Sequence, residues 1–290
     1  MANNPLFEVF GFPPDDMTEE AKRHREKKLC PFNNKVLECT KDKAGDPLGV
    51  CSIVDRDSST IICPIRFRQN WRVAADAAEF FGFSPGSWTV MREVRLNDKN
   101  GRSAGNIDLV IVDRDERGRL RDFGSVEVQA VYISGNVRRP FEHYMNDPEG
   151  RQNMNWTATQ VRADYLSSSR KRLMPQLIYK GEILKAWGKK QTVAIHRTFF
   201  ETLPKPPTVS REEAEMAWFV YDLSHNSATG GYGLTLVDTV YTEFEPALLK
   251  ITSPEPGPVN DFVEVLQRRL DKERSSSEAW INRPRKDRGQ

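Results

Sequence analysis

The sequence predicts an α/β protein, because runs typical of strands are interspersed with runs typical of helices. Residues 107–112 and 123–132 are rich in β-branched residues and are separated by the polar turn DRDERGRL, which predicts an antiparallel pair of strands. Residues 157–173 have apolar side chains at helical spacing, and Pro175 is expected to end that helix. All the cysteines fall in the first 63 residues, which predicts a separate small region there.

The rest of the chain adds one expected strand and two expected helices. Residues 189–203 predict a core strand that contains His196 as a packed core residue. Residues 205–224 begin with a proline-rich turn and predict an acidic helix. Residues 252–258 predict a linker, and residues 261–274 fit a short amphipathic helix.

The composition excludes several classes of protein. Hydrophobic residues make up 38% of the 290 residues and charged residues 29%, which is atypical of a disordered or collagen-like chain. The sequence contains no run of eighteen apolar residues, which is about the length needed to span a bilayer. The first residues, MANNPLFEVFGFPPDDMTEE, lack the basic start and apolar stretch of a secretory signal. We therefore expect a cytoplasmic protein with reduced thiols and no membrane partner.

Charge is distributed unevenly along the chain. Residues 151–200 contain ten Lys or Arg and two acids, whereas residues 201–265 contain three Lys or Arg and eleven acids. A positive segment of this size attracts polyanions, of which nucleic acid is the commonest. A solvated basic face beside an acidic neighbour is the alternative.

The cysteines predict a structural metal site. Cys30, Cys39, Cys51 and Cys63 lie close together in the sequence, and proline or glycine near them favours tight turns. Four thiolates around one ion form a closed tetrahedral site that suits zinc or iron and leaves no open position for substrate. Disulfides and buried free thiols are the alternatives, and the reducing compartment argues against disulfides.

Carboxylates in the central strands predict a second kind of site. Glu127 and Gln129 are two residues apart in a strand, so their side chains emerge on one face, and a hairpin brings Asp108 alongside them. Glu93 is a less certain third acid. Hydrolysis of a phosphodiester needs a divalent ion such as Mg²⁺, which prefers carboxylate oxygens. The common nuclease pattern D…(D/E)xK has Lys where this chain has Gln129, which cannot carry a positive charge.

Several blocks taken together resemble the NotI family of Type II restriction endonucleases. The blocks are EVFGF, LCPF, GVCS, IICPIRF, NIDLVIVD, VEVQAVYISGN, NWTATQ and RKRLMPQLIYKGEIL, and their order and spacing cover most of the chain. The resemblance implies a PD-(D/E)xK nuclease core, in which a mixed central sheet is flanked by helices and Gln replaces the Lys. It also implies that the clustered cysteines hold a structural iron and that Asp108, Glu127 and Gln129 form the active site.

The segment after the predicted active strand is dense in side chains that contact DNA. Arg makes paired hydrogen bonds to guanine, and Asp or Glu accepts one from cytosine. Any one such residue is more often solvated, and phosphate contacts outnumber base contacts. The candidates for groove or phosphate contacts are Arg138, Arg139, Glu142, His143, Arg151, Gln152, Asn155, Arg170, Lys171 and Arg172, with Lys35, Lys41 and Lys43 as possible additions from the cysteine region.

The leading hypothesis is a Mg²⁺-dependent Type II restriction endonuclease of the bacterial cytoplasm. It would cut both strands of a G·C-rich palindrome as a homodimer, and the resemblance suggests a target containing CGGCCG. A metal-stapled DNA-binding regulator that does not cut, and a less sequence-specific nuclease of the same core fold, are the alternatives. The expected domains are 1–70 for the metal-binding region, 71–252 for the catalytic and DNA-recognition core, and 253–290 for a C-terminal helix and flexible tail.

Overall fold

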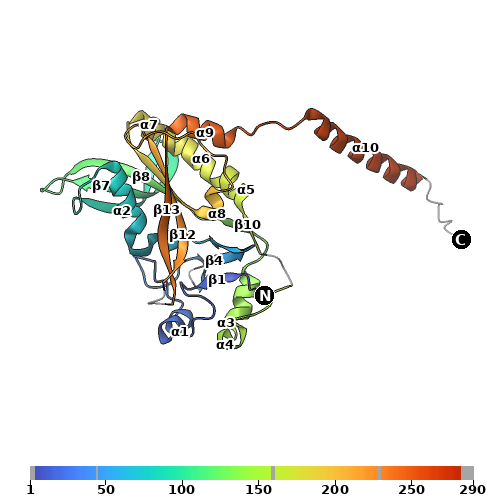
Figure 1. Ribbon diagram of the computed structural model, residues 1–290, viewed down its shortest axis with the longest axis horizontal. Coiled ribbons are helices and arrows are strands. Elements are labelled where there is room, and N and C mark those ends of the chain that lie inside the picture. The colour runs from blue at the N-terminus through green and yellow to red at the C-terminus, as the bar shows by residue number, and fades with distance from the viewer. Residues whose placement is uncertain (1–3, 44, 158–160, 227–229, 282–290) are drawn as a thin grey trace. The chain divides into compact units, whose positions relative to one another are not determined.

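The protein is described by a computed structural model (Figure 1), which covers residues 4–43, 45–157, 161–226 and 230–281. Of residues 275–281 it describes the backbone alone. The chain divides into two compact units, Met1–Thr252 and Ser253–Gln290, which are considered separately.

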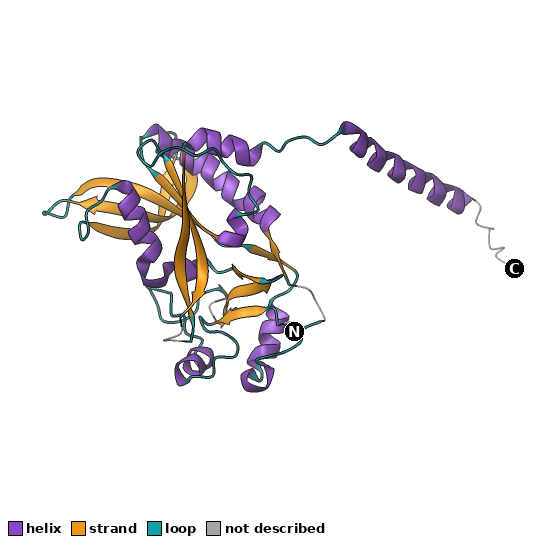
Figure 2. Ribbon diagram, in the orientation of Figure 1, coloured by secondary structure: helices purple, strands orange, loops and turns teal. Residues whose placement is uncertain are grey.

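A six-stranded mixed sheet forms the centre of the first unit (Figure 2). The strand β11 is parallel to both of its neighbours, and the other pairs are antiparallel. This arrangement confirms the predicted α/β class with a mixed central sheet flanked by helices. In spatial order the strands are β13 (Tyr232–Thr242), β12 (Met216–His225), β11 (Gln191–His196), β8 (Leu120–Gln129), β7 (Ser103–Arg114) and β6 (Trp88–Asn97).

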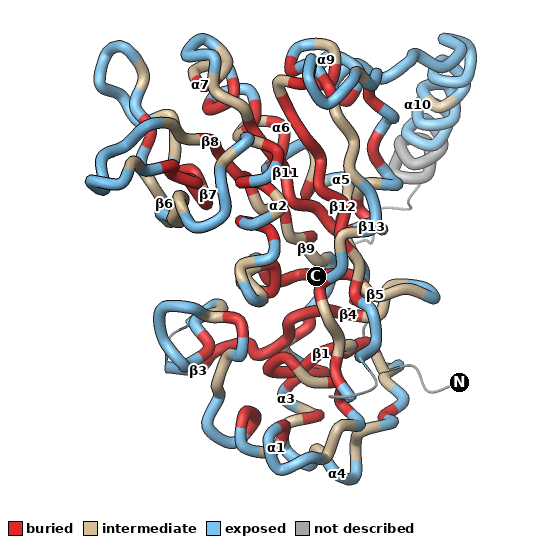
Figure 3. Tube along the Cα trace, turned by 60° about the vertical axis from the view of Figure 1, so that its left-hand side comes forward, coloured by how far each residue is buried: buried red, intermediate tan, exposed pale blue. Residues whose placement is uncertain are grey.

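Helices cover both faces of this sheet. The helix α2 (Arg72–Phe81) packs Val73, Ala77 and Phe80 against one face, where the side chains of Leu109 and Val126 point. The opposite face packs against the segment 165–186 and α9 (Phe244–Thr252), which follow that side of the sheet in Figure 1. Every residue of β11 is buried, because helices cover it on both sides (Figure 3).

The helical segment 165–186 differs from the prediction. The expected helix 157–173 includes residues 158–160, outside the described part of the chain, and Arg162–Asp164 is instead a short strand, β10. The helix then continues past Pro175, which lies between two π-helical stretches. A wider π turn relieves the clash of the proline ring with the preceding turn and accommodates its missing N–H. The stretches are α5 (Tyr165–Ser168), η2 (Ser169–Leu173), α6 (Met174–Gln176), η3 (Leu177–Gly181) and α7 (Glu182–Ala186).

Two neighbouring predictions are also corrected. The acidic helix expected over 205–224 is wrong, because Met216–His225 forms β12, whose apolar run is buried in the sheet. The acids that suggested the helix lie in the loop and turn before this strand. The strand expected over 189–203 is correct for Gln191–His196, after which Arg197–Phe200 forms the helix α8. His196 is fully buried, as predicted.

The cysteine region is built around a small three-stranded sheet. Its strands occur in the order β1 (Leu6–Val9), β4 (Val50–Asp55), β5 (Ser58–Ile61). Phe141 and Tyr144 of α3 (Arg138–Met145) pack into the same core as Phe10, so this later segment folds back on the cysteine region. The remaining elements of the first unit are α1 (Glu19–Glu26), β2 (Asp42–Lys43), β3 (Asp46–Pro47), η1 (Pro64–Trp71), β9 (Tyr132–Ser134) and α4 (Pro148–Arg151).

A buried ion pair joins the cysteine region to the central sheet. Arg66 of η1 and Glu8 of β1 have no exposed side-chain surface, and two guanidinium nitrogens lie 3.0 Å from the carboxylate oxygens. Arg66 also donates to the backbone carbonyl of Tyr232 in β13 at 2.8 Å and lies 4.1 Å from the ring of Phe32. Ser52 of β4 donates to Glu8 at 2.7 Å. The ion pair therefore connects β1, β4, η1 and β13.

The second unit contains the helix α10 (Val259–Ile281), which begins after the predicted linker and is longer than expected. Its exposed apolar side chains include Phe262, Leu266 and Leu270. Among the described residues, no helix is both long enough and apolar enough to cross a membrane.

Replacing Arg66 is expected to destabilise the first unit strongly. Arg66→Met leaves the Glu8 carboxylate buried without its partner, which typically costs about 3–5 kcal/mol. The free energy of unfolding, measured by urea denaturation, should fall by about this amount.

The matched control is Arg119→Met, because the Arg119 side chain is 71% exposed and pairs with Asp115 at the surface. It should leave the urea midpoint nearly unchanged. An Arg66→Met protein as stable as this control would contradict the proposed role of the buried pair.

Candidate active site

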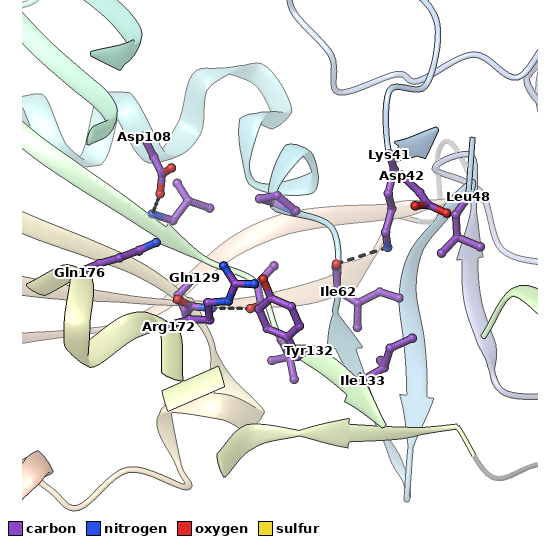
Figure 4. Close-up of a pocket in the computed structure, with 14 residues that line it drawn as sticks. Lys41, Asp42, Leu48, Ile62, Asp108, Gln129, Tyr132, Ile133, Arg172 and Gln176 are labelled. Carbon is purple, nitrogen blue, oxygen red and sulfur yellow. Dashed lines mark hydrogen bonds between the residues drawn. The ribbon is translucent and has the colours of Figure 1, made fainter. Parts of the chain in front are cut away.

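The hairpin of β7 and β8 places Asp108 opposite Glu127. The pair Leu109↔Val126 is adjacent in the antiparallel register, and side chains alternate along each strand. Glu127 and Gln129 are buried on the face that packs against the helical segment 165–186. The Asp108 carboxylate accepts a hydrogen bond from the Val128 backbone N–H at 2.9 Å (Figure 4). Asp108 and Glu127 therefore lie side by side, and Gln129 lines the same cleft as Asp108.

Burial governs the charge state of these carboxyl groups. It raises the pKa of Glu127 to about 8, and repulsion from Asp108 contributes to the shift. Burial also raises the pKa of Asp108, which the Val128 hydrogen bond and the nearby Lys180 oppose. Ionisation of both groups together is therefore unfavourable, and a cation that binds both would favour their ionised forms.

Lys180, which no sequence pattern predicted, contacts Glu127 directly. Its side chain is 3% exposed, and its ammonium nitrogen lies 2.5 Å from Glu127 Oε2 and 2.8 Å from the carbonyl oxygen of Asn106. The other carboxylate oxygen, Glu127 Oε1, is buried without a hydrogen-bond partner in the described part of the chain. The sequence signal that could have indicated its burial is that Lys180 is the only cation in the largely apolar stretch LMPQLIYKGEIL.

Glu93 is placed differently from the other predicted acids. Because Arg92 pairs with Leu109 and Val94 with Ile107, Glu93 lies opposite Asp108 across the β6–β7 ladder. Its side chain is 71% exposed, and its carboxylate lies 3.7 Å from Arg68 of η1. Arg68 interacts electrostatically with both Glu93 and Asp108. The structure thus brings a guanidinium, rather than a third buried carboxylate, toward Asp108.

A cleft of about 670 Å³ opens beside these residues. Figure 4 shows Asp108, Gln129 and Arg172 on one side of it and Lys41 and Leu48 of the cysteine region on the other. The Gln129 amide donates to the Ala130 carbonyl at 2.6 Å, which orients the side chain. The Arg172 guanidinium lies 4.8 Å from the centre of the Tyr132 ring. The cleft therefore carries Asp108 and an exposed cation, Arg172, whereas Glu127 lies buried behind it.

The four cysteines are drawn together by two loops and one small sheet. Backbone hydrogen bonds join Cys63 to Cys51 at 3.2 Å, Cys30 to Leu37 and Cys39 to Lys28. Burial and mutual repulsion raise the pKa of the Cys30 thiol to about 11, and they raise those of Cys39 and Cys51 as well. Cys63 contributes to all three shifts. The four cysteines are free rather than disulfide-bonded, and they interact electrostatically with one another.

Among the described residues, however, no group of three or more His, Cys, Asp or Glu side chains is placed so that it could hold a metal ion. The chemistry of the donor sets nevertheless fits metal ions. Four thiols suit iron or zinc, and the unpartnered Glu127 Oε1 beside Asp108 suits a hard divalent cation.

The candidate DNA contacts divide into paired and exposed residues. Arg138 forms ion pairs with Asp42 at 2.6 Å and Asp46 at 2.7 Å, so it holds the loop of the cysteine region. Arg151 donates to the His143 carbonyl, and His143 packs 5.4 Å from Trp156. Lys41 donates to the Val50 and Ile62 carbonyls, and Gln152 donates to the Glu149 carbonyl. The exposed candidates are Arg139, Glu142, Asn155, Arg170, Lys171 and Arg172, together with Lys35 and Lys43.

Comparison with known protein families matches residues 15–234 to the family described as restriction endonuclease NotI. The chain belongs to this family. The resemblance inferred from the sequence is thereby confirmed, and membership implies a Type II site-specific deoxyribonuclease whose partner is DNA. A comparison with curated proteins finds no match. The matched region includes the cysteines, the β7–β8 hairpin and the helical segment 165–186.

Replacing Glu127 is expected to change how stability depends on pH. The folded-state pKa of Glu127 is raised to about 8 from the ordinary value of 4.5. The neutral carboxyl therefore stabilises the fold fully below pH 4.5, and this contribution is lost as the pH rises toward 8. With a chelator present, the free energy of unfolding should fall more steeply over this interval for the unmodified protein than for Glu127→Gln.

Glu93→Gln serves as the control, because its carboxylate is mostly exposed. It should keep the pH slope of the unmodified protein. Identical slopes for Glu127→Gln and the unmodified protein would show that burial does not hold Glu127 neutral.

Proposed function

We propose that this restriction endonuclease hydrolyses the DNA backbone with Mg²⁺ at Asp108 and Glu127, within a core of the PD-(D/E)xK type. The observation that supports the proposal is the register of β7 and β8, which sets the buried Glu127 beside Asp108, and Asp108 lines a cleft. The unpartnered Glu127 Oε1 provides a ligand atom in this pair. The target we propose is a G·C-rich palindrome that contains CGGCCG.

Each residue has a distinct role in this reaction. Asp108 and Glu127 would hold the ion, which would polarise the scissile phosphate and lower the pKa of the attacking water. Gln129 lines the same cleft and would orient that water through its amide, since it cannot act as a base. Arg68 lies near Asp108 and would attract the DNA phosphate. Cleavage would leave a 5′-phosphate and a 3′-hydroxyl.

Recognition would rely on the exposed candidates rather than on the paired ones. Arg139, Asn155, Arg170 and Lys171 are free to approach a duplex, and Arg172 lies at the cleft itself. Arg138 would act indirectly, because it holds Asp42 and Asp46 in place. A homodimer would present one centre to each strand of a palindrome.

The cysteine region would be closed by one iron or zinc ion bound to Cys30, Cys39, Cys51 and Cys63. Because the thiols carry raised pKa values, they would release protons when the metal binds. Leu48 and Ile62 of this region line the cleft, so a metal ion that stabilises the region would also hold one wall of the proposed DNA site in place.

Asp108→Ala and Glu127→Ala are expected to abolish cleavage while DNA binding persists. Each removes a ligand of the proposed ion but no cation that approaches the DNA. Incubation with plasmid DNA and Mg²⁺ should yield discrete fragments with the unmodified protein and none with either variant.

Glu116→Gln is the control, because this exposed residue lies in the same hairpin and should leave cleavage intact. Full cleavage by purified Asp108→Ala protein would refute the assignment. A smear in place of discrete fragments would indicate a nonspecific nuclease, and binding without cutting by the unmodified protein would indicate a regulator.

Cys51→Ser is expected to lower the metal content and the stability of the protein. The unmodified protein should contain close to one iron or zinc atom per chain by elemental analysis, and the variant several-fold less, because a hydroxyl is a poor ligand for these ions. Lys43→Ala, an exposed neighbour, should keep the full content. Absence of stoichiometric metal from the unmodified protein would refute the site.

A further inference from the structure

A buried lysine contacts one of the two carboxylates that we assign to the reaction. Lys180 donates to Glu127 Oε2 at 2.5 Å and to the Asn106 carbonyl at 2.8 Å, and its side chain is 3% exposed. Lysine is rarely buried unless it is paired, and removing one member of such a pair is costly. The contact is therefore a specific feature of this site rather than an incidental surface pair.

The fold is built closely around this side chain. Lys180 lies in the π-helical stretch Leu177–Gly181, and π turns occur often at functional sites. A Cβ atom at the next residue, Gly181, would lie 2.4 Å from the Phe244 ring, so glycine allows the helix to approach closely there. On the strand side, Gly105 has φ +115° and faces the Lys180 side chain, at the start of the run that carries Asp108.

We propose that Lys180 is the positioning residue that supplies, from the helix, the positive charge that Gln129 cannot supply from the strand. The inference rests on the assignment of Glu127 and Asp108 to the cleavage centre. The common pattern has a lysine two residues after the acid, on the same face of the strand. In this chain Gln129, an uncharged amide, holds that position. The ammonium group of Lys180 instead reaches the Glu127 carboxylate from the helical segment packed on the sheet.

The contact also assigns different tasks to the two oxygens of Glu127. Lys180 occupies Oε2, while Oε1 lacks a partner among the residues described. A carboxylate held by one oxygen has a fixed orientation, and the free oxygen remains available as a ligand. A preorganised cation beside two acids would also reduce their repulsion toward an incoming phosphate.

The alternative is that Lys180 only compensates a buried acid during folding. The two roles predict different results when the charge is moved. If the charge at this carboxylate matters for the reaction, a lysine introduced at position 129 should replace Lys180, because Gln129 lines the cleft with Asp108 and shares a strand face with Glu127. If Lys180 serves folding alone, the relocated lysine should not restore cleavage.

The test compares Lys180→Met with the double variant Lys180→Met/Gln129→Lys. Single-turnover cleavage of plasmid DNA with Mg²⁺ should slow by about 100-fold in Lys180→Met, as when one preorganised donor is lost, while DNA binding measured by fluorescence anisotropy is kept. The double variant should cleave at least about tenfold faster than Lys180→Met. Lys180→Gln keeps a hydrogen-bond donor without the charge and should also be slow, so it carries the test if Lys180→Met does not fold.

Lys185→Met is the matched control, because Lys185 lies on the same helical segment and pairs with the exposed Glu245. It should cleave at the rate of the unmodified protein. A folded Lys180 variant that cleaves at the normal rate, or a folded double variant no faster than the single one, would overturn the inference. If Asp108→Ala is inactive in the same assay, the proposed function stands even when the lysine inference fails; an active Asp108→Ala protein would instead defeat the proposed function.

Discussion

Repulsion between two neighbouring carboxyl groups is the constraint around which the central site is organised. Asp108 and Glu127 are opposed across β7 and β8 and are mostly buried, so their joint ionisation is unfavourable without cations nearby. Lys180 approaches from the helix and interacts with both acids, and Arg68 approaches from η1 and interacts with Asp108. If DNA is cut at this place, as we propose, the same cations that relieve the repulsion also favour the substrate.

The position of the cysteine region depends on a second buried charge pair. Arg66 and Glu8 are fully enclosed, and Arg66 reaches the backbone of β13 at Tyr232. Because a buried charge is costly unless it is paired, the contact strongly favours one placement of this region against the central sheet. That placement makes Leu48 and Ile62 part of the cleft that also contains Asp108 and Gln129. The cysteine region is thus a wall of the same cleft.

Local patterns were informative where the periodicity was strong. The alternation in NIDLVIVD and VEVQ correctly predicted two antiparallel strands, with Asp108 brought beside Glu127 and Gln129. The sequence prediction is wrong at two places where it depends on a single residue type. Pro175 does not end the helix as predicted. The helical segment continues to Ala186, because Leu177 and Leu184 remain buried and two π turns accommodate the proline. The acids before Met216 predict a helix, but the apolar run that starts at Met216 is buried in the sheet as the strand β12.

The sequence by itself determined the class of fold, the family and the hairpin that sets Asp108 beside Glu127, because these depend on short-range alternation and on residues that are close together along the chain. Only the tertiary structure decided that Lys180 contacts Glu127, since 53 residues separate them and no local pattern relates a helix position to a strand position. It likewise decided that Arg138 pairs with Asp42 and Asp46 rather than standing free. Burial and charge pairing are properties of the packed chain, and a linear pattern does not contain them.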